Sequence, residues 1–191
     1  MKKLMIGLLA TLFLAISSHA AEEALVLPTI SGKKIHVIGT QNGLKFQEYQ
    51  GKVVFLEFWG THCPPCRMSI PNYIKLQKKY KNKLAIVAIE VQDTPKEALK
   101  TFVKEQGINY NVIAYRDAVN FVGYISKRAR WQGSIPFLII LDKNGNVVTM
   151  QVGLLNEKAL DGLVAKLSEI PSKTGKKAPS ESNASKAPSK K

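Results

Sequence analysis

The sequence predicts an α/β domain in which a hydrophobic sheet is covered by helices on both faces. Segments of strand length alternate with segments of helical periodicity, and two of the strand segments are almost continuously apolar, as in strands buried on both faces. The chain has 191 residues, 45% of them hydrophobic and 22% charged. This length suits one domain with short extensions, and the composition excludes collagen-like, wholly disordered and multi-span membrane proteins.

The first predicted elements are a β-hairpin, a buried strand and a helix. Lys34–Ile38 and Gly43–Tyr49 flank a turn-like segment and are predicted to form the hairpin. Lys52–Trp59 reads Lys-Val-Val-Phe-Leu-Glu-Phe-Trp, which is the pattern of a buried strand. Pro65–Lys81 has apolar residues at helical spacing, and we expect Pro71 to kink this helix.

The remaining segments continue the alternation of strands and helices. Thr94 is expected to cap a helix that has Pro95 at its first position and ends near Gln106. The other expected elements are the strands Leu84–Val91 and Asn111–Tyr115, the helix Asp117–Trp131, the hairpin of Phe137–Leu141 with Asn146–Val152, and the closing helix Asn156–Ile170.

The N-terminal segment predicts export. Met1–Ala20 combines the basic residues Lys2 and Lys3, an apolar run too short to span a bilayer, and a small-x-small site at its end. We therefore expect residues 1–20 to be a cleavable signal peptide, with an uncleaved membrane anchor as the alternative. Export implies an oxidising compartment, and we expect the periplasm.

The C-terminal segment differs in composition from the rest of the chain. Residues 171–191 are rich in Ser, Ala, Pro and Lys, and they contain no aromatic or branched apolar residue. Such a segment cannot bury enough surface to offset the entropy of ordering, so we expect a disordered tail after a domain of residues 21–170. The tail contains an N-x-S sequon at Asn183, which indicates either glycosylation or chance occurrence in a Ser-rich segment.

Positive charge is concentrated at the two ends. The chain carries 28 Lys and Arg against 14 Asp and Glu, a net charge of +14, but the tail holds +5 and the leader +2, which leaves +7 for the domain. We expect no nucleic-acid partner, because the chain is exported and its basic residues do not alternate with exposed aromatic residues. Anionic lipid headgroups or acidic proteins are the expected partners of this charge.

The sequence contains two cysteines, and they predict redox chemistry. Cys63 and Cys66 form a Cys-Pro-Pro-Cys segment between a buried strand and a helix. A helix N-terminus stabilises a thiolate, so we expect Cys63 to be the exposed nucleophile of low pKa. Cys66 lies one turn further on, where it can resolve a mixed disulfide. Pro64 and Pro65 lack backbone N–H groups and stiffen this loop.

A pair of cysteines can also form a structural disulfide, bind a metal or attach haem covalently. A structural disulfide is one alternative, although a disulfide that closes so short a loop removes little entropy from the unfolded chain. A metal site needs more ligands than a mature chain offers with His36 and His62 as its histidines. Covalent haem attachment needs a histidine directly after the second cysteine, where this chain has Arg67.

The segment Phe-Trp-Gly-Thr-His-Cys-Pro-Pro-Cys-Arg resembles the thioredoxin superfamily, and within it the TlpA/ResA/CcmG group of exported thiol–disulfide oxidoreductases. The resemblance covers about Leu44–Ile170. It implies a thioredoxin-like fold: a central mixed β-sheet flanked by helices, with an N-terminal β-hairpin and an inserted β–α unit. It also implies that Pro136 is a cis-proline facing the dithiol and that the Ile135 backbone pairs with substrate, whereas a trans-proline at a strand start is the alternative.

Several positions near the cysteines define the candidate site. Glu57 stands in an otherwise apolar strand, and we expect it to be an acid/base of raised pKa that assists Cys66, unless it lies at a sheet edge paired with a lysine. Ser69 replaces an acidic residue common in the family, and His62 replaces the usual tryptophan. We expect Trp59 and His62, together with Pro64 and Pro65, to contact substrate.

The resulting hypothesis is a periplasmic reductant of protein disulfides without a cofactor. The resemblance implies substrates such as the oxidised Cys-x-x-Cys of apocytochrome c during cytochrome c maturation. It also implies re-reduction by a membrane thiol-reductant donor of the CcdA/DsbD type. A general oxidant or isomerase uses the same chemistry, and a metal or haem chaperone is an alternative of a different class.

Overall fold

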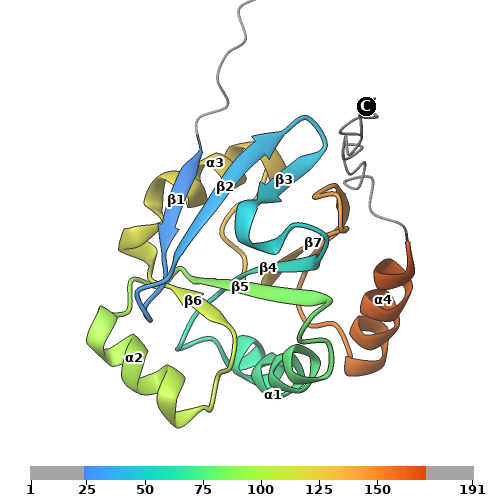
Figure 1. Cartoon of the computed structure of the whole chain (residues 1–191). Coiled ribbons are helices and arrows are strands. Elements are labelled where there is room, and N and C mark those ends of the chain that lie inside the picture. The colour runs from blue at the N-terminus through green and yellow to red at the C-terminus, as the bar shows by residue number, and fades with distance from the viewer. Residues whose placement is uncertain (1–23, 171–191) are drawn as a thin grey trace, which may run out of the picture.

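A mixed five-stranded sheet forms the centre of the protein, and its middle strand leads into the cysteine motif. The computed structural model describes residues 24–170, so the expected signal peptide 1–20 and the tail 171–191 with Asn183 lie outside the described residues. The strand order is β6-β5-β4-β7-β8, with β4–β6 parallel and β7 and β8 added in antiparallel fashion (Figure 1). The strands are β4 (Val53–Trp59), β5 (Leu84–Glu90), β6 (Asn111–Ile113), β7 (Phe137–Leu141) and β8 (Val147–Val152).

Helices cover both faces of this sheet, as the sequence predicts. Alternate residues of β4 face opposite sides, because side chains alternate along a strand. Val54, Leu56 and Phe58 pack in the cluster that includes α3, whereas Val53 and Phe55 pack in the cluster that includes α1 and α4. The helices are α1 (Pro64–Lys79), α2 (Lys96–Glu105), α3 (Val119–Ala129) and α4 (Glu157–Glu169) (Figure 1).

A second, smaller sheet packs against the face that α3 covers. Its hairpin consists of β2 (Lys34–Thr40) and β3 (Gly43–Phe46), which confirms the predicted N-terminal hairpin. A third strand, β1 (Leu25–Pro28), pairs with β2 and was missed because four residues carry little periodic signal. Figure 1 shows β1 and β2 beside α3, away from α1.

The chain between β5 and β7 contains α2, β6 and α3. These elements include the inserted β–α unit that the family resemblance implies, and they separate Cys66 from Pro136 in sequence. Strand β6 extends the sheet beside β5, where Ala88 pairs with Val112. Within residues 24–170, none of the helices is long and apolar enough to cross a membrane.

Two predicted element boundaries were wrong for physical reasons. The helix α2 is capped by the backbone of Pro95 and begins at Lys96, because the Thr94 hydroxyl donates to Glu90 instead of capping the helix. The helix expected at Asp117–Trp131 is shorter, because a separate 3₁₀ turn at Tyr115–Asp117 precedes α3. Helix α1 continues through Pro71 as one element.

Candidate active site

Cys63 and Cys66 form a disulfide at the point where β4 gives way to α1. Their Cα atoms are 5.2 Å apart. Cys63 is the N-cap of α1 with an extended backbone (φ −101°, ψ 104°), and Pro64 and Pro65 occupy the first positions of the helix. The disulfide pairing and the position of Cys63 at the helix N-terminus agree with the sequence analysis.

The sulfur of Cys63 takes the place of a capping oxygen. Pro64 and Pro65 have no N–H groups, so the first free donor of the helix is the backbone N–H of Cys66. This N–H donates to Cys63 Sγ at 3.3 Å. The same donor, with the positive end of the helix dipole, would stabilise a thiolate on Cys63 after reduction.

The two cysteines differ in burial and in their surroundings. Both cysteines are buried in the disulfide form, Cys63 at 6% and Cys66 at 1% exposure, so Cys63 is the less buried of the two but is not the exposed residue that the sequence predicts. Both pack in a cluster with Trp59, Ile70 and other apolar residues of the α1 and α2 side. The smaller burial of Cys63 is consistent with the expected order, in which Cys63 attacks the substrate and Cys66 resolves the mixed disulfide.

Glu57 lies in the middle of the central strand and is 2% exposed. It has β5 on one side and β7 on the other, so the alternative of a sheet edge paired with a lysine is wrong. Burial raises the pKa of the Glu57 carboxyl to about 8, and hydrogen bonding to Ser69 and Tyr73 opposes this rise. At neutral pH the carboxyl is therefore largely protonated.

Ser69 connects Glu57 to the resolving cysteine. Its hydroxyl lies 2.7 Å from the carbonyl oxygen of Cys66 and 3.3 Å from Oε1 of Glu57. Ser69 is itself buried, 5% exposed. The Ser69 hydroxyl thus links the Glu57 carboxyl to the backbone of Cys66 inside an otherwise apolar region. The titratable proton of Glu57 is therefore one side chain away from the resolving cysteine.

Two tyrosines complete the surroundings of Glu57. Tyr73 and Tyr110 pack edge to face with ring centroids 6.1 Å apart. Burial, and after it the charge that Glu57 can carry, raise the pKa of both phenols well above the ordinary value. Both hydroxyls therefore stay protonated, and the sequence analysis did not identify either of them.

The segment before β7 brings Pro136 to the site. The Ile135–Pro136 peptide bond is cis, as the family resemblance implies. Ile135 is half-buried and packs against the cluster that contains both cysteines. The indole of Trp131, which sequence analysis did not single out, donates to the carbonyl of Ser134 at 2.8 Å and thereby holds this segment.

The expected substrate contacts separate into exposed and buried residues. His62 and Pro64 are exposed and Pro65 is half-buried, so these side chains are available to a partner. Trp59 is 2% exposed and packs on Phe102 with ring centroids 5.7 Å apart. The structure therefore places Trp59 in the support beneath the disulfide and not on the surface where substrate would lie.

The loop after β5 supports the segment before Cys63. The backbone N–H of His62 donates to Oε1 of Gln92 at 2.9 Å. Gly60 leaves room for this side chain, because a Cβ at position 60 would lie 2.1 Å from Gln92 Oε1. The sequence analysis did not identify Gln92 or the fully buried Glu90, and it assigned Thr94 to a helix cap, because the contacts of Gln92 with His62 and of Thr94 with Thr61 join residues about thirty positions apart.

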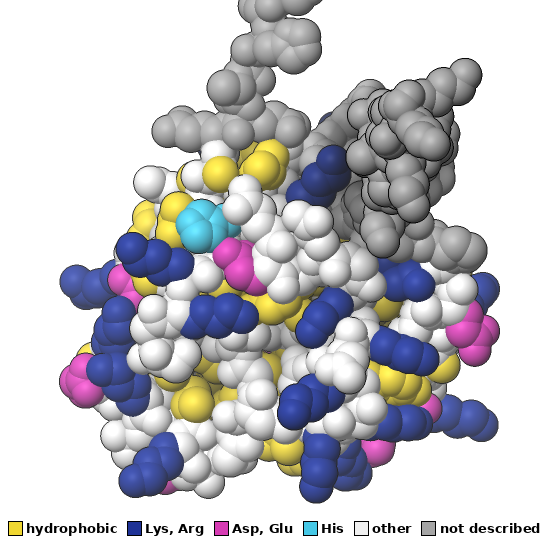
Figure 2. Space-filling model, in the orientation of Figure 1, with side chains coloured by type: hydrophobic (Ala, Val, Ile, Leu, Met, Phe, Trp, Pro, Cys, Tyr) yellow, Lys and Arg dark blue, Asp and Glu magenta, His cyan; other side chains and the backbone are white. Residues whose placement is uncertain are grey.

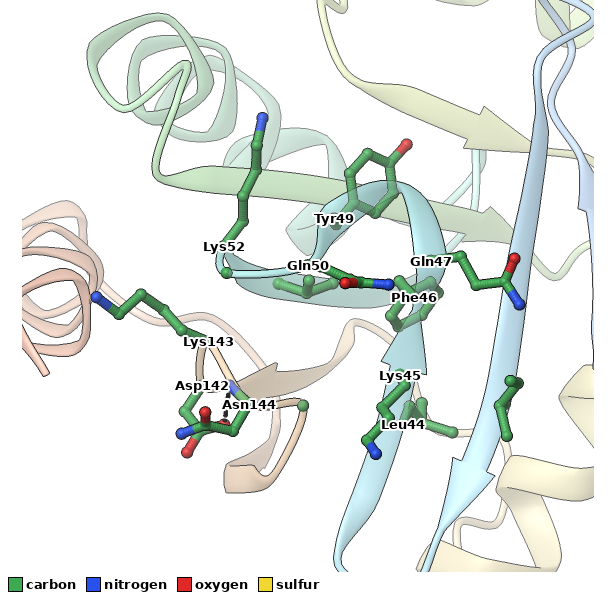
Figure 3. Close-up of a pocket in the computed structure, with 14 residues that line it drawn as sticks. Leu44, Lys45, Phe46, Gln47, Tyr49, Gln50, Lys52, Asp142, Lys143 and Asn144 are labelled. Carbon is green, nitrogen blue, oxygen red and sulfur yellow. Dashed lines mark hydrogen bonds between the residues drawn. The ribbon is translucent and has the colours of Figure 1, made fainter. Parts of the chain in front are cut away.

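A pocket of about 310 Å³ lies far from the disulfide, at the opposite end of the central sheet. It is bounded by β3, the segment Gln47–Lys52 and the turn Asp142–Gly145 (Figure 3). Strand β4 begins here and ends at the cysteine motif, so the pocket belongs to a separate surface. Among residues 24–170, no three His, Cys, Asp or Glu side chains gather as a metal-binding group.

Comparison with known proteins assigns the chain to a family. Residues 27–150 match the AhpC/TSA family. The chain is 32% identical over 143 residues to the thiol-disulfide oxidoreductase ResA of Bacillus cereus, covering 74% of this chain and 73% of the relative. It is 29% identical over 137 residues to the thioredoxin-like protein YneN of Bacillus subtilis, covering 71% of each.

A solved structure supports the same assignment. A thioredoxin-family thiol:disulfide interchange protein from Chlorobium tepidum superposes with a TM-score of 0.60 at 27% identity, covering 76% of this chain and 93% of that one. The fold, the disulfide at a helix N-terminus and the cis-proline segment agree with this similarity. The chain belongs to the thioredoxin-like AhpC/TSA family and is a thiol–disulfide oxidoreductase of the ResA type.

Proposed function

We propose that this oxidoreductase works in the periplasm as a reductant of protein disulfides, with Cys63 as the attacking thiolate. The observation that carries the assignment of roles is the asymmetry of the disulfide. Cys63 caps α1 and is nearer to solvent, whereas Cys66 is buried beside the path to Glu57. The direction of electron transfer rests on the resemblance to exported reductases.

The reaction begins with the reduced protein. The Cys63 thiolate attacks one sulfur of a substrate disulfide, a bond forms between them, and the other substrate sulfur leaves with the electron pair. Cys66 then loses its proton and attacks Cys63, which releases the second substrate sulfur and restores the Cys63–Cys66 disulfide. The substrate gains two electrons, and the protein loses them.

Glu57 supplies the acid/base function in this proposal. A carboxyl with a pKa of about 8 exchanges protons near neutral pH, which is the range in which a buried thiol must be deprotonated. As a carboxylate, Glu57 would accept the proton that Cys66 releases when it attacks. Ser69 orients the carboxyl toward that end of α1.

We propose apocytochrome c as the substrate class and a membrane thiol-reductant donor of the CcdA/DsbD type as the source of electrons. A substrate with an oxidised Cys-x-x-Cys presents a small, accessible disulfide that suits a single reactive sulfur. In this proposal the backbone of the half-buried Ile135, next to the cis-proline Pro136, pairs with an extended substrate peptide, as in strand addition.

The equilibrium potential of Cys63–Cys66 against glutathione tests the direction. A value at or below that of the glutathione pool supports a reductant. A value near those of strong oxidants would assign the protein to oxidation or isomerisation instead. Stoichiometric retention of metal or haem by the purified protein, without reduction of insulin, would instead indicate the chaperone alternative.

We also propose that the remote basic surface contacts anionic lipid headgroups. Lys45, Lys52 and Lys143 border the 310 Å³ pocket, and Figure 3 shows them around the apolar side chain of Phe46. Lysine and arginine side chains outnumber acidic ones on the same face of the molecule (Figure 2). Clustered cations near a membrane attract anionic headgroups, each contributing about 1 kcal/mol near the surface.

Vesicle flotation of residues 21–170 tests this contact. Binding to vesicles with anionic lipid that weakens with salt, and weakens further in a K45E/K143E variant, supports it. The exposed lysine Lys100, which pairs with Glu97 on α2, provides a matched K100E control. Equal binding to neutral vesicles, or equal loss in the control, would refute a site at this pocket.

A further inference from the structure

A chain of hydrogen bonds connects a buried carboxylate to the histidine before Cys63. Glu90, at the end of β5, has no exposed surface. Its Oε1 accepts from the Thr94 hydroxyl at 2.9 Å, the Thr94 hydroxyl lies 2.8 Å from that of Thr61, and the Thr61 hydroxyl lies 3.1 Å from Nδ1 of His62. This series of hydrogen bonds connects the segment after β5 with the segment after β4 and ends at the surface.

The partners of each group fix the direction of every bond in this chain. A carboxylate only accepts, so Thr94 donates its single hydroxyl proton to Glu90. Thr94 then accepts from Thr61, whose proton is used in turn. Thr61 can therefore only accept from His62, which requires a proton on Nδ1. The nitrogen that remains to gain or lose a proton is Nε2.

Further bonds hold both ends of the chain in place. Glu90 also accepts from the backbone N–H of Gln92 and of Thr94, both at 3.0 Å. The backbone N–H of His62 donates to Gln92 Oε1. His62 is thus anchored at its backbone and at Nδ1, while its side chain is exposed immediately before the reactive sulfur.

The charged groups closest in the fold to the His62 segment come from β5, the loop that follows it and helix α1. Besides Glu90, the loop after β5 carries Asp93, which is paired with Arg116 by two bonds of 2.8 Å. Helix α1 contributes Arg67, whose guanidinium lies over the ring of Phe102, 5.6 Å from its centroid. Of these groups Glu90 is the carboxylate without a cationic partner among the described residues, and it reaches His62 through the threonines.

We propose that Nε2 of His62 donates a proton to the substrate sulfur that leaves when Cys63 attacks, and that Glu90, Thr94 and Thr61 are positioning residues for this step. The proposal rests on the proposed role of Cys63 as the nucleophile. The Cys63–substrate bond forms as the substrate disulfide breaks. The leaving thiolate keeps the electron pair and takes the Nε2 proton, and water later returns a proton to His62.

The hydrogen bonds around His62 already suit the form that remains after Nε2 loses its proton. After Nε2 has given up its proton, His62 is the neutral form with the proton on Nδ1, which is the form that the threonine chain requires. No hydrogen bond in the chain has to reverse during the step. The free-energy cost of reorganising the site is therefore small, as effective acid catalysis requires.

Nitrogen NMR of the histidine rings tests the positioning directly. In the wild-type protein the neutral form of His62 should carry its proton on Nδ1. Thr94→Val and Thr61→Val should shift the population toward the Nε2-protonated form. Thr101→Val on α2, which loses only a local bond to the carbonyl of Glu97, should leave the signal unchanged. An Nε2-protonated His62 in the wild type would overturn the proposal.

Leaving-group dependence tests the chemical role. We compare the rates at which the reduced protein attacks an alkyl disulfide, whose thiolate needs a proton, and an aryl disulfide, whose thiolate does not. The alkyl-to-aryl rate ratio should fall about tenfold in His62→Gln and less in Thr94→Val, below the ~10²-fold typical of acid catalysis because thiolates leave readily. An unchanged ratio would refute proton donation by His62.

These outcomes are separate from failure of the proposed function. If the wild-type protein forms no mixed disulfide through Cys63, the proposed function fails, and the NMR experiment still reports the position of the proton on His62. If Cys63 reacts but the rate ratio does not depend on His62, the proposed function stands and the inference is wrong.

Discussion

Ser69 and Glu57 lie 3.3 Å apart, hydroxyl to carboxyl, in the apolar region between β4 and α1. The same hydroxyl lies 2.7 Å from the carbonyl oxygen of Cys66. The acidic group of this site therefore sits on the central strand, and the helix contributes the neutral hydroxyl that contacts it. Because of this pairing, we expect Glu57 to be the titratable group that responds to changes at the buried cysteine.

Stability should decrease as the pH rises toward 8 because of Glu57. Its pKa is about 8 in the folded protein and 4.5 as an ordinary carboxyl, so the folded state binds more protons between these values. The destabilisation caused by ionising the buried Glu57 is absent below the lower pKa and complete above the higher one. Glu57→Gln should therefore raise the free energy of unfolding at pH 9 by up to about 5 kcal/mol, with little change at pH 4.

Urea denaturation of the oxidised protein at both pH values measures this effect. Glu97→Gln, which removes an exposed carboxylate of α2, is the control for a general change in net charge. An equal effect of Glu57→Gln at pH 4 and pH 9 would show that the carboxyl does not titrate in this range.

Loss of the Ser69 hydroxyl should move the titration of Glu57 further upward. The bond from Ser69 lowers the pKa of Glu57, so Ser69→Ala should raise it. The inflection in the pH profile of mixed-disulfide resolution should shift to higher pH, whereas Ser126→Ala in α3 should not move it. A shift to lower pH would contradict the assigned hydrogen bond.

A side chain at Gly60 should disturb the reactive loop more than overall folding. The added Cβ would overlap the Gln92 side chain, with its Cγ at 2.6 Å and Oε1 at 2.1 Å, and would displace the acceptor of the His62 N–H. Gly60→Ala should slow attack on substrate disulfides roughly tenfold, which corresponds to about 1.4 kcal/mol in the barrier.

Gly123→Ala provides the matched control for this change. Gly123 lies in α3 with nothing within 4 Å of an added Cβ, so alanine there should preserve the rate and favour the helix by about 1 kcal/mol. The account of the loop is wrong if Gly60→Ala reacts at the wild-type rate.

The sequence predicts the features of this protein that arise from local patterns. The near-continuous apolar runs of β4 and β5 indicate buried strands, and the position of Cys63 between a strand and two prolines indicates a helix N-terminus. The burial of Glu57 follows from its place in an apolar strand. Each of these inferences uses residues that are close together in sequence.

The features that the sequence did not predict depend on contacts between distant segments. Thr94 has the residue type and position of a helix cap, but a bond to buried Glu90 uses its hydroxyl. Thr61 and Thr94 are 33 positions apart, and their contact follows from the pairing of β4 with β5. Trp59 looks like a surface aromatic beside the cysteines, but α2 covers it through Phe102.

Trapping of the mixed disulfide tests the central claim most directly. Reduced Cys66→Ala and Cys63→Ala variants are each mixed with a peptide that contains a Cys-x-x-Cys disulfide, and the adducts are measured by intact mass. The account predicts rapid adduct formation through Cys63 in Cys66→Ala and almost none in Cys63→Ala, because Cys66 is 1% exposed. Equal trapping by both variants, or faster trapping through Cys66, would contradict it.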